Sequence, residues 1–103
     1  MTSEEAQANP DIVTSIMIVF GTPARILFDT RFSQSFVSTT FALHANKKLV
    51  LLKNKLVVNM PLGEQILRTS VFKGCEILVE GVVLKENLIP LEMFDFDVIL
   101  RMD

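Results

Sequence analysis

Short apolar runs rich in Val, Ile and Leu recur from residue 12 to the end of the chain, and residues typical of turns separate them. We expect strands at residues 12–20, 24–28, 49–60, 65–72, 75–79, 82–84, 88–91 and 97–100. These eight segments, of which 88–91 is only a short extended piece, amount to seven or so short strands; with one short helix they predict an all-β domain, most simply a closed or partly closed barrel.

The helix is expected after Ser33 or Ser35, either of which can cap it. The residues that recur there at helical spacing are Phe36, Val37, Thr40 and Phe41. His44 falls near the end of this helix, where we assign it no chemistry. Further on, residues 85–87 predict a polar turn, and Pro90 places its own segment at a sheet edge or in an irregular strand.

A chain of 103 residues is expected to form one domain, here residues 12–103, after a flexible polar leader at residues 1–11. Half of its residues are apolar, which is high for a small monomer and predicts an interface with a partner. The net charge is −2, and the basic cluster at residues 47–55 is interpreted as a solvated strand edge rather than a nucleic-acid patch. We therefore expect no direct contact with nucleic acid.

Cys75 is the only cysteine and His44 the only histidine, so one chain can assemble neither a disulfide nor a Cys/His zinc site. We expect no metal and no cofactor. The longest uninterrupted apolar run, residues 16–20, is too short to cross a bilayer, and the first residues carry acids where a signal peptide carries Lys or Arg. These features predict an intracellular, cytoplasmic protein that does not contact membranes.

One acidic residue follows a β-type apolar run, in the segment Ile-Leu-Phe-Asp-Thr-Arg at residues 26–31. A carboxylate directly behind three large apolar residues is costly to desolvate unless hydrogen-bond donors or a second acid share its proton, as in a general acid or base. The alternative is that Asp29 only caps the turn that follows the strand. The residues of this segment alone leave both interpretations open.

Residues 28–38, Phe-Asp-Thr-Arg-Phe-Ser-Gln-Ser-Phe-Val-Ser, resemble the active-site segment of the retropepsin-like aspartic proteases in plant gypsy-type LTR retrotransposon polyproteins. That pattern reads hydrophobic-Asp-Ser/Thr-Gly-Ala-Ser-His-Ser-Phe-Ile-Ser. The similarity continues in family order to the closing segment Asp-Val-Ile-Leu-Arg-Met-Asp at residues 97–103, and it covers roughly residues 12–103.

The resemblance implies an aspartic endopeptidase in which Asp29 is the catalytic acid and Thr30 its hydroxyl partner. The catalytic dyad needs two such aspartates. The other candidates within the chain, Asp95, Asp97 and Asp103, lie in the closing segment, whose family counterpart is structural, so we expect a second copy of the chain to supply the other Asp29. The implied substrate is an extended peptide or polyprotein. The active-site loop comprises Thr30, Arg31, Phe32 and Ser33. The mobile flap over the peptide comprises Pro61, Leu62, Gly63, Glu64 and Gln65, and the closing segment comprises Ile99, Leu100 and Arg101.

Three residues depart from the family pattern at the chemistry itself. Arg31 and Arg101 replace glycines, and Phe32 replaces a small alanine. Arg31 is expected to favour ionised Asp29 and to oppose a shared proton, and Arg101 is expected to crowd the approach of the last strand to the active-site loop. We therefore expect an impaired protease; the alternatives are a non-catalytic dimerisation or peptide-binding module, or a decayed relic. The family also continues beyond Asp103, so closing structure is expected to be missing here.

Overall fold

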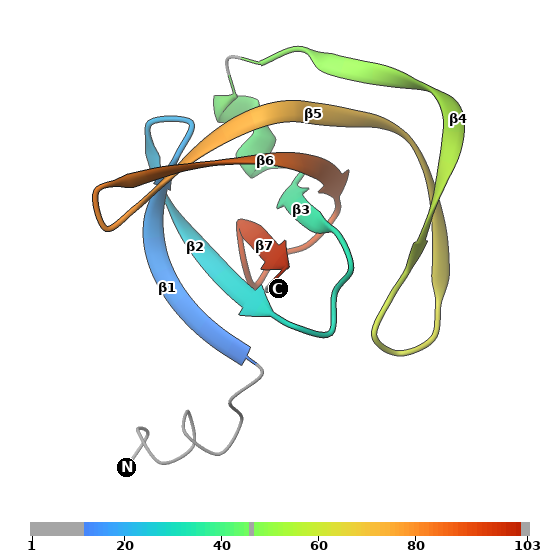
Figure 1. Cartoon of the computed structure of the whole chain (residues 1–103), viewed down its shortest axis with the longest axis horizontal. Coiled ribbons are helices and arrows are strands. Elements are labelled where there is room, and N and C mark those ends of the chain that lie inside the picture. The colour runs from blue at the N-terminus through green and yellow to red at the C-terminus, as the bar shows by residue number, and fades with distance from the viewer. Residues whose placement is uncertain (1–11, 46, 102–103) are drawn as a thin grey trace.

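The computed structural model describes residues 12–45 and 47–101, which form seven strands and one short 3-10 helix (Figure 1). The elements are β1 (Ile12–Val19), β2 (Thr22–Asp29), β3 (Ser35–Ser38), η1 (Phe41–His44), β4 (Leu49–Asn59), β5 (Gln65–Val79), β6 (Val82–Leu91) and β7 (Val98–Arg101). The predicted all-β class is confirmed. The proposed leader at residues 1–11 lies outside the described residues and stays a prediction.

All seven strands belong to one sheet in the order β1-β2-β7-β3-β6-β5-β4. A further pairing of β1 with β5 joins the two ends of six of these strands, so they form a closed ring. β4 pairs with β5 outside this ring, and together they form a long curved hairpin that extends to one side in Figure 1.

Two-residue turns connect the strands that pair as short hairpins. Phe20 and Gly21 join β1 to β2 with φ of 55° and 71°, and Glu80 and Gly81 join β5 to β6 with φ of 49° and 82°. Positive φ at both central residues is typical of type I′ turns, whose twist matches that of the flanking strands. The expected strands at 12–20 and 24–28 leave residues 21–23 for the first turn, whereas the structure has it at Phe20 and Gly21. The twist of the two strands favours this two-residue turn.

The prediction of a helix beginning near Ser33 or Ser35 is wrong, because residues 35–38 form strand β3 between β6 and β7. All four residues of β3 are buried, so the alternation that identifies a half-exposed strand is absent. The helix is the single 3-10 turn Phe41–His44, and the Phe41 N–H donates to Ser38 Oγ at 2.8 Å. His44 is the last residue of this turn, as expected.

The expected breaks within residues 65–79 and 82–91 are also wrong, because β5 and β6 are each continuous. Residues 85–87 lie within β6 instead of a polar turn: Lys85 and Glu86 pair with Glu76 and Cys75 of β5, and Asn87 lies at the register shift beside them. Pro90 pairs with Val37 of β3, and the β5 ladder ends at Leu88, so Pro90 needs no second ladder donor. The expectation of an edge strand is wrong for β6 as a whole, which lies between β3 and β5; only residues 89–91, around Pro90, have a ladder partner on one side alone.

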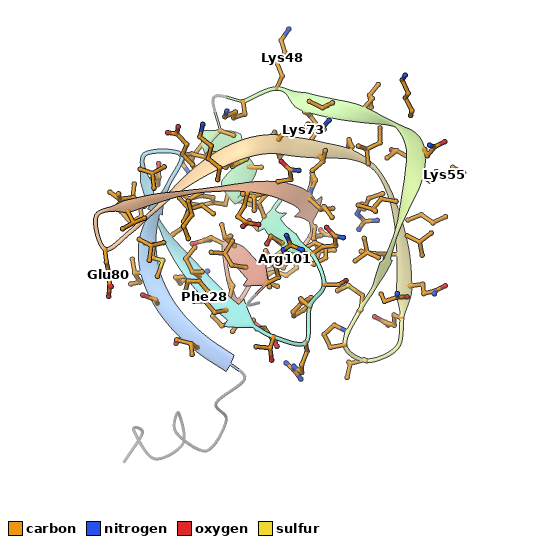
Figure 2. The ribbon with its side chains drawn as sticks, in the orientation of Figure 1. Phe28, Lys48, Lys55, Lys73, Glu80 and Arg101 are labelled. Atoms are coloured by element: carbon orange, nitrogen blue, oxygen red, sulfur yellow. The ribbon has the colours of Figure 1, made fainter. Side chains whose placement is uncertain are left out.

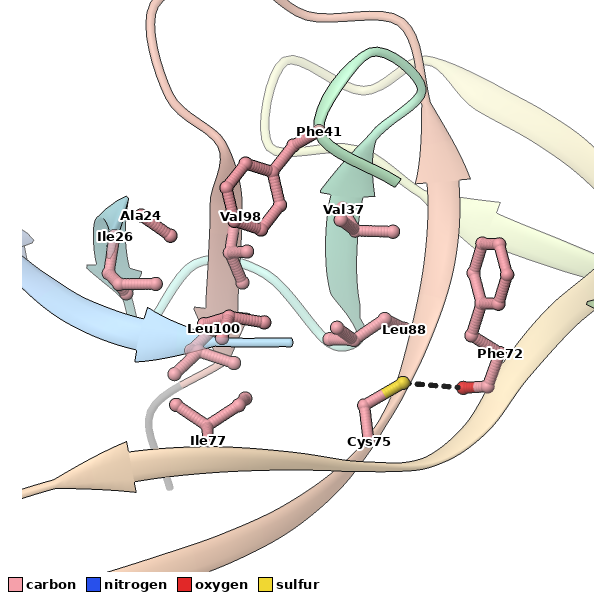
Figure 3. Packing of buried hydrophobic residues seen from close by; sticks show 11 residues of the cluster. Ala24, Ile26, Val37, Phe41, Phe72, Cys75, Ile77, Leu88, Val98 and Leu100 are labelled. Carbon is pink, nitrogen blue, oxygen red and sulfur yellow. Dashed lines mark hydrogen bonds between the residues drawn. The ribbon is translucent and has the colours of Figure 1, made fainter. Parts of the chain in front are cut away.

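Two apolar clusters pack on opposite faces of the central strands. The first fills the ring and is shown in part in Figure 3; it includes Ile26, Val37, Cys75, Ile77, Leu88 and Val98. The second joins the other face to the β4–β5 hairpin and is centred on Phe36, Val58, Val71, Ile89 and Ile99. Neighbouring residues alternate between the clusters, so β3, residues 88–89 of β6 and residues 98–100 of β7 are buried on both faces.

Candidate functional site

Asp29 is the last residue of β2 and begins the loop that leads to β3. β2 runs parallel to β7 here, and Asp29 is the ladder partner of Arg101. Figure 2 shows Phe28 at the end of β2 and Arg101 on β7 near the centre of the molecule. β7 lies between β2 and β3 in the sheet, so its pairing with β2 places Asp29 next to Arg101.

The Asp29 carboxylate is held by Arg31, two residues further along the chain. The Arg31 backbone N–H donates to Oδ1 at 2.9 Å, Nε donates to Oδ1 at 3.0 Å and to Oδ2 at 3.2 Å, and Nη2 donates to Oδ2 at 2.7 Å. The Asp29 side chain is fully buried, whereas the Arg31 side chain is 51% exposed. The guanidinium thus covers the carboxylate from the solvent side in a bidentate ion pair.

This contact keeps Asp29 ionised. The side-chain hydrogen bonds from Arg31 lower the pKa of Asp29 below its ordinary value of 3.8, and the backbone N–H and the positive charge of Arg31 act in the same direction. Burial alone would raise the pKa, but the hydrogen bonds to the charged form outweigh it. An acid in this state accepts hydrogen bonds well and is a poor donor of a proton.

Replacing Arg31 by Gln is expected to lower the free energy of unfolding at pH 7 by about 1 kcal/mol, the scale for hydrogen bonds to a charged group when the cation is half-exposed. A lowered folded-state pKa stabilises the fold above the unfolded-state pKa, and this stabilisation is lost as pH falls through the folded-state pKa. The difference between the two chains should therefore shrink below pH of about 4. Urea unfolding between pH 7 and pH 2 measures it.

Arg25→Gln is the matched control, because the Arg25 side chain approaches Asp97 only through Nε at 3.7 Å, and its Nη2 donates one further hydrogen bond to Phe94 O at 3.2 Å. We expect this variant to cost less than about 0.5 kcal/mol. An Arg31→Gln effect that stays constant down to pH 2 would show that the ion pair with Asp29 contributes nothing to stability.

The remaining loop residues have separate surroundings. Thr30 and Ser33 are exposed, while Phe32 is half-buried and meets Phe36 edge-on, with ring centroids 5.7 Å apart. Ser35 caps no helix, contrary to expectation; its buried Oγ accepts the Arg101 N–H at 3.2 Å. Phe32 packs against the second apolar cluster, to which residues of the β4–β5 hairpin also belong.

The hairpin tip lies at the predicted residues. The Met60 N–H donates to Glu64 O at 2.7 Å and the Gly63 N–H to Met60 O at 2.9 Å, and Gly63 has the positive φ of 96° that favours glycine. Pro61 is half-buried, and Leu62 is 88% exposed at the apex. At the base of the tip, Gln65 Nε2 donates to Asn59 Oδ1 at 2.9 Å. Whether the tip moves as a flap stays a prediction.

The closing segment differs from expectation at one residue. Ile99 and Leu100 are buried in opposite clusters, as a doubly covered strand requires. Arg101 is exposed and still forms the ladder contact with Asp29, so it does not keep β7 away from β2. The expectation that Arg101 crowds this approach is wrong, because its side chain turns into a polar hollow of about 200 Å³ beside Ser35 and Glu86.

Asp97, another acid of the closing segment, has a local structural contact. Its Oδ2 accepts the Arg25 N–H at 2.8 Å and lies 3.7 Å from Arg25 Nε. Within residues 12–45 and 47–101, no group of three or more His, Cys, Asp or Glu side chains could hold a metal ion. The same part of the chain contains no helix long and apolar enough to cross a membrane.

A groove that sequence reasoning missed lies beside the loop. It has a volume of about 420 Å³ and is lined by Gln34 together with residues of β4, β5 and β6, among them Lys53, Lys55 and Lys73. Lys73 is distant in sequence from the cluster at residues 47–55, so only strand pairing brings the three lysines to one groove.

An aspartate at the end of a buried strand, a short loop, a hairpin and a closing strand beside the acid, in this order within a closed sheet, define a retropepsin-like domain. The sequence model of the retroviral aspartyl protease family matches residues 1–103, and the chain belongs to that family. No curated protein matches the chain.

Proposed function

We propose that this chain is the aspartic protease domain of a retrotransposon polyprotein of the plant gypsy type, with a dyad formed by Asp29 from two copies. Membership of the retroviral aspartyl protease family supports this proposal, together with the position of Asp29 at the end of β2, where the β2–β3 loop begins. In such a dyad two carboxylates share one proton; one activates a water molecule, and the other protonates the carbonyl oxygen of the peptide.

We further propose that the dyad is impaired, and the bidentate Asp29–Arg31 ion pair carries this part of the proposal. In a symmetric dimer both copies of Arg31 would lie beside the carboxylate pair. Two cations there favour two ionised carboxylates, whereas the reaction needs one proton between them. Each guanidinium also occupies the oxygen atoms that would otherwise hold the water molecule and the shared proton.

A peptide-binding module that does not cut is the second candidate. The groove beside Gln34 favours it, because residues of the β4–β5 hairpin line that groove. Binding there does not depend on the protonation of Asp29. Both candidates share the β4–β5 hairpin and an extended peptide as ligand. They differ only in whether Asp29 reacts.

Homodimerisation follows from the need for two aspartates, and exposed apolar side chains such as Ile16 and Leu51 support it. We expect a dimer in sedimentation at high micromolar concentration, and no Asp29-dependent cleavage of a peptide library between pH 4 and 7. A monomer would contradict the dyad, provided that a chain extended beyond Asp103 also stays monomeric.

A location in the cytoplasm is likewise a proposal. The lone Cys75, which is buried beside Phe72 in the ring, is compatible with a reducing compartment. Burial raises the pKa of the Cys75 thiol, so this cysteine is poorly reactive. Expression with a fluorescent tag and imaging would test the location directly.

A further inference from the structure

The groove beside Gln34 combines an aliphatic floor with a basic rim. Two of its floor residues are buried members of the second apolar cluster, and the other two pack against it; they are Leu52, Leu56, Val71 and Ile89. The rim is polar and consists of Gln34, Lys53, Asn54, Lys55, Lys73 and Asn87. The three lysines are exposed, so their ammonium groups are accessible to a ligand.

Two irregularities of the sheet create this rim. Residues 52–55 of β4 have only Thr69 of β5 opposite them, and residues 73–74 of β5 have only Asn87 of β6 opposite them. The Gly74 N–H donates to Asn87 Oδ1 at 2.9 Å, which stabilises the second bulge. Bulges re-aim side chains that a regular ladder would direct elsewhere, and here both bulges contribute lysines to one groove.

Positive charge continues past the groove. The polar hollow of about 200 Å³ shares Gln34 and Asn87 with it and adds Lys85 and Arg101, against one acid, Glu86. The two hollows therefore hold five cations and one carboxylate, in a chain whose net charge is −2. In the part of the chain that the structure describes, none of these five cations forms an ion pair.

We propose that this basic groove selects extended peptides with acidic side chains next to an aliphatic one. The lysine rim attracts the carboxylates, and the aliphatic floor binds the neighbouring apolar side chain. Successive side chains of an extended peptide point to opposite sides, so a peptide that alternates acidic and aliphatic residues presents one kind to the rim and the other to the floor.

The position of Gln34 relates this preference to the candidate dyad. Gln34 lies five residues after Asp29, so the chain can separate the two by at most about 18 Å, the span of about five extended residues. An acidic side chain bound next to Gln34 would thus lie within about five residues of the bond that faces Asp29. The inference rests on the proposed function in one respect, namely that a peptide is the ligand of the loop and hairpin.

Shape and composition favour a peptide over a nucleic acid. Single-stranded nucleic acids are bound by aromatic side chains on which bases stack, and this groove has an aliphatic floor with no aromatic residue among those that line it. A groove of about 420 Å³ also accommodates a few side chains rather than a long charged backbone. The test includes a nucleic acid as a probe, and tighter binding of that probe would contradict the choice of a peptide.

The test measures binding by fluorescence anisotropy with the chain carrying Asp29→Asn, so that no probe is cut. The probes are three labelled ligands of ten units: a peptide that alternates Glu with Val, its Gln counterpart, and an oligothymidylate. We expect the Glu peptide to bind at least tenfold more tightly than the Gln peptide at 50 mM salt, and the difference to diminish at 500 mM salt because salt screens exposed charges.

The lysines are tested with matched variants. Lys53→Gln, Lys55→Gln and Lys73→Gln together should weaken binding of the Glu peptide about tenfold and leave the Gln peptide unchanged. Lys73→Glu alone should also weaken binding of the Glu peptide. Lys48→Glu is its control and should not weaken binding, because Lys48 projects away from the rest of the molecule in Figure 2. Thermal melts establish that each variant is folded.

Each outcome decides between named alternatives. Equal affinity for the Glu and Gln peptides, or an equal effect of Lys48→Glu and Lys73→Glu, overturns the inference. Tighter binding of oligothymidylate that the lysine variants abolish replaces the peptide by a nucleic acid. Charge-dependent peptide binding without cleavage by any variant supports the inference while the proposed protease function fails, and cleavage without charge preference does the reverse.

Discussion

The chain with Arg31→Gly, Phe32→Ala and Arg101→Gly is expected to cleave peptides with a kcat/KM at least about 10²-fold above that of the unmodified chain, the lower end of what general acid–base catalysis contributes. Removing the guanidinium releases both oxygens of Asp29, and the pKa of this acid then rises toward the range in which two carboxylates share a proton. Removing the Phe32 ring opens space under the hairpin.

Three comparisons separate this explanation from others. Asp29→Asn in the restored chain should abolish cleavage, and Arg31→Lys should stay inactive because a cation remains beside the carboxylate. Arg101 does not displace β7, so Arg101→Gly alone should not restore activity. Restoration should require Arg31→Gly. Robust Asp29-dependent cleavage by the unmodified chain would show that the ion pair opens readily and does not inhibit.

Phe36→Ala is expected to lower the free energy of unfolding by about 3–5 kcal/mol, the usual cost of removing a large buried aromatic side chain. Phe36 is fully buried at the centre of the second apolar cluster, where it contacts the Phe32 ring, and this cluster joins the β4–β5 hairpin to the ring of strands. A cavity there should loosen the hairpin as well as the fold. Urea unfolding gives the first effect, and amide hydrogen exchange in residues 56–68 gives the second.

Phe94→Ala is the matched control, because Phe94 is 76% exposed and its loss should change stability by no more than about 0.5 kcal/mol. Where Phe36→Ala is too unstable to study, Phe36→Leu fills part of the cavity and should show the same pattern at a smaller cost. Equal effects of the two alanine variants, or hairpin exchange that does not change, would contradict the role assigned to the second cluster.

Local chemistry was sufficient to predict the features that depend on neighbouring residues. The β-branched runs of β1, β2 and β4, the turn before Gln65 and the acid that ends β2 were all predictable, because turn residues and periodicity act over a few positions. The influence of Arg31 on Asp29 was also predictable in direction, since the two residues are two positions apart. The order of strand, acid loop and hairpin could be recognised as retropepsin-like through the resemblance of residues 28–38 to the active-site segment of that family.

Only the tertiary structure decided the features that depend on partners distant in sequence. The predicted helix over β3 is wrong because strands buried on both faces lack alternation, and the predicted turn at residues 85–87 is wrong because Lys85 and Glu86 pair with residues of β5. The course of β7 beside Asp29 and the meeting of Lys73 with Lys53 at one groove likewise follow from strand pairing and bulges. A single sequence records the side chains that strands carry, whereas register and bulges determine which of those side chains meet.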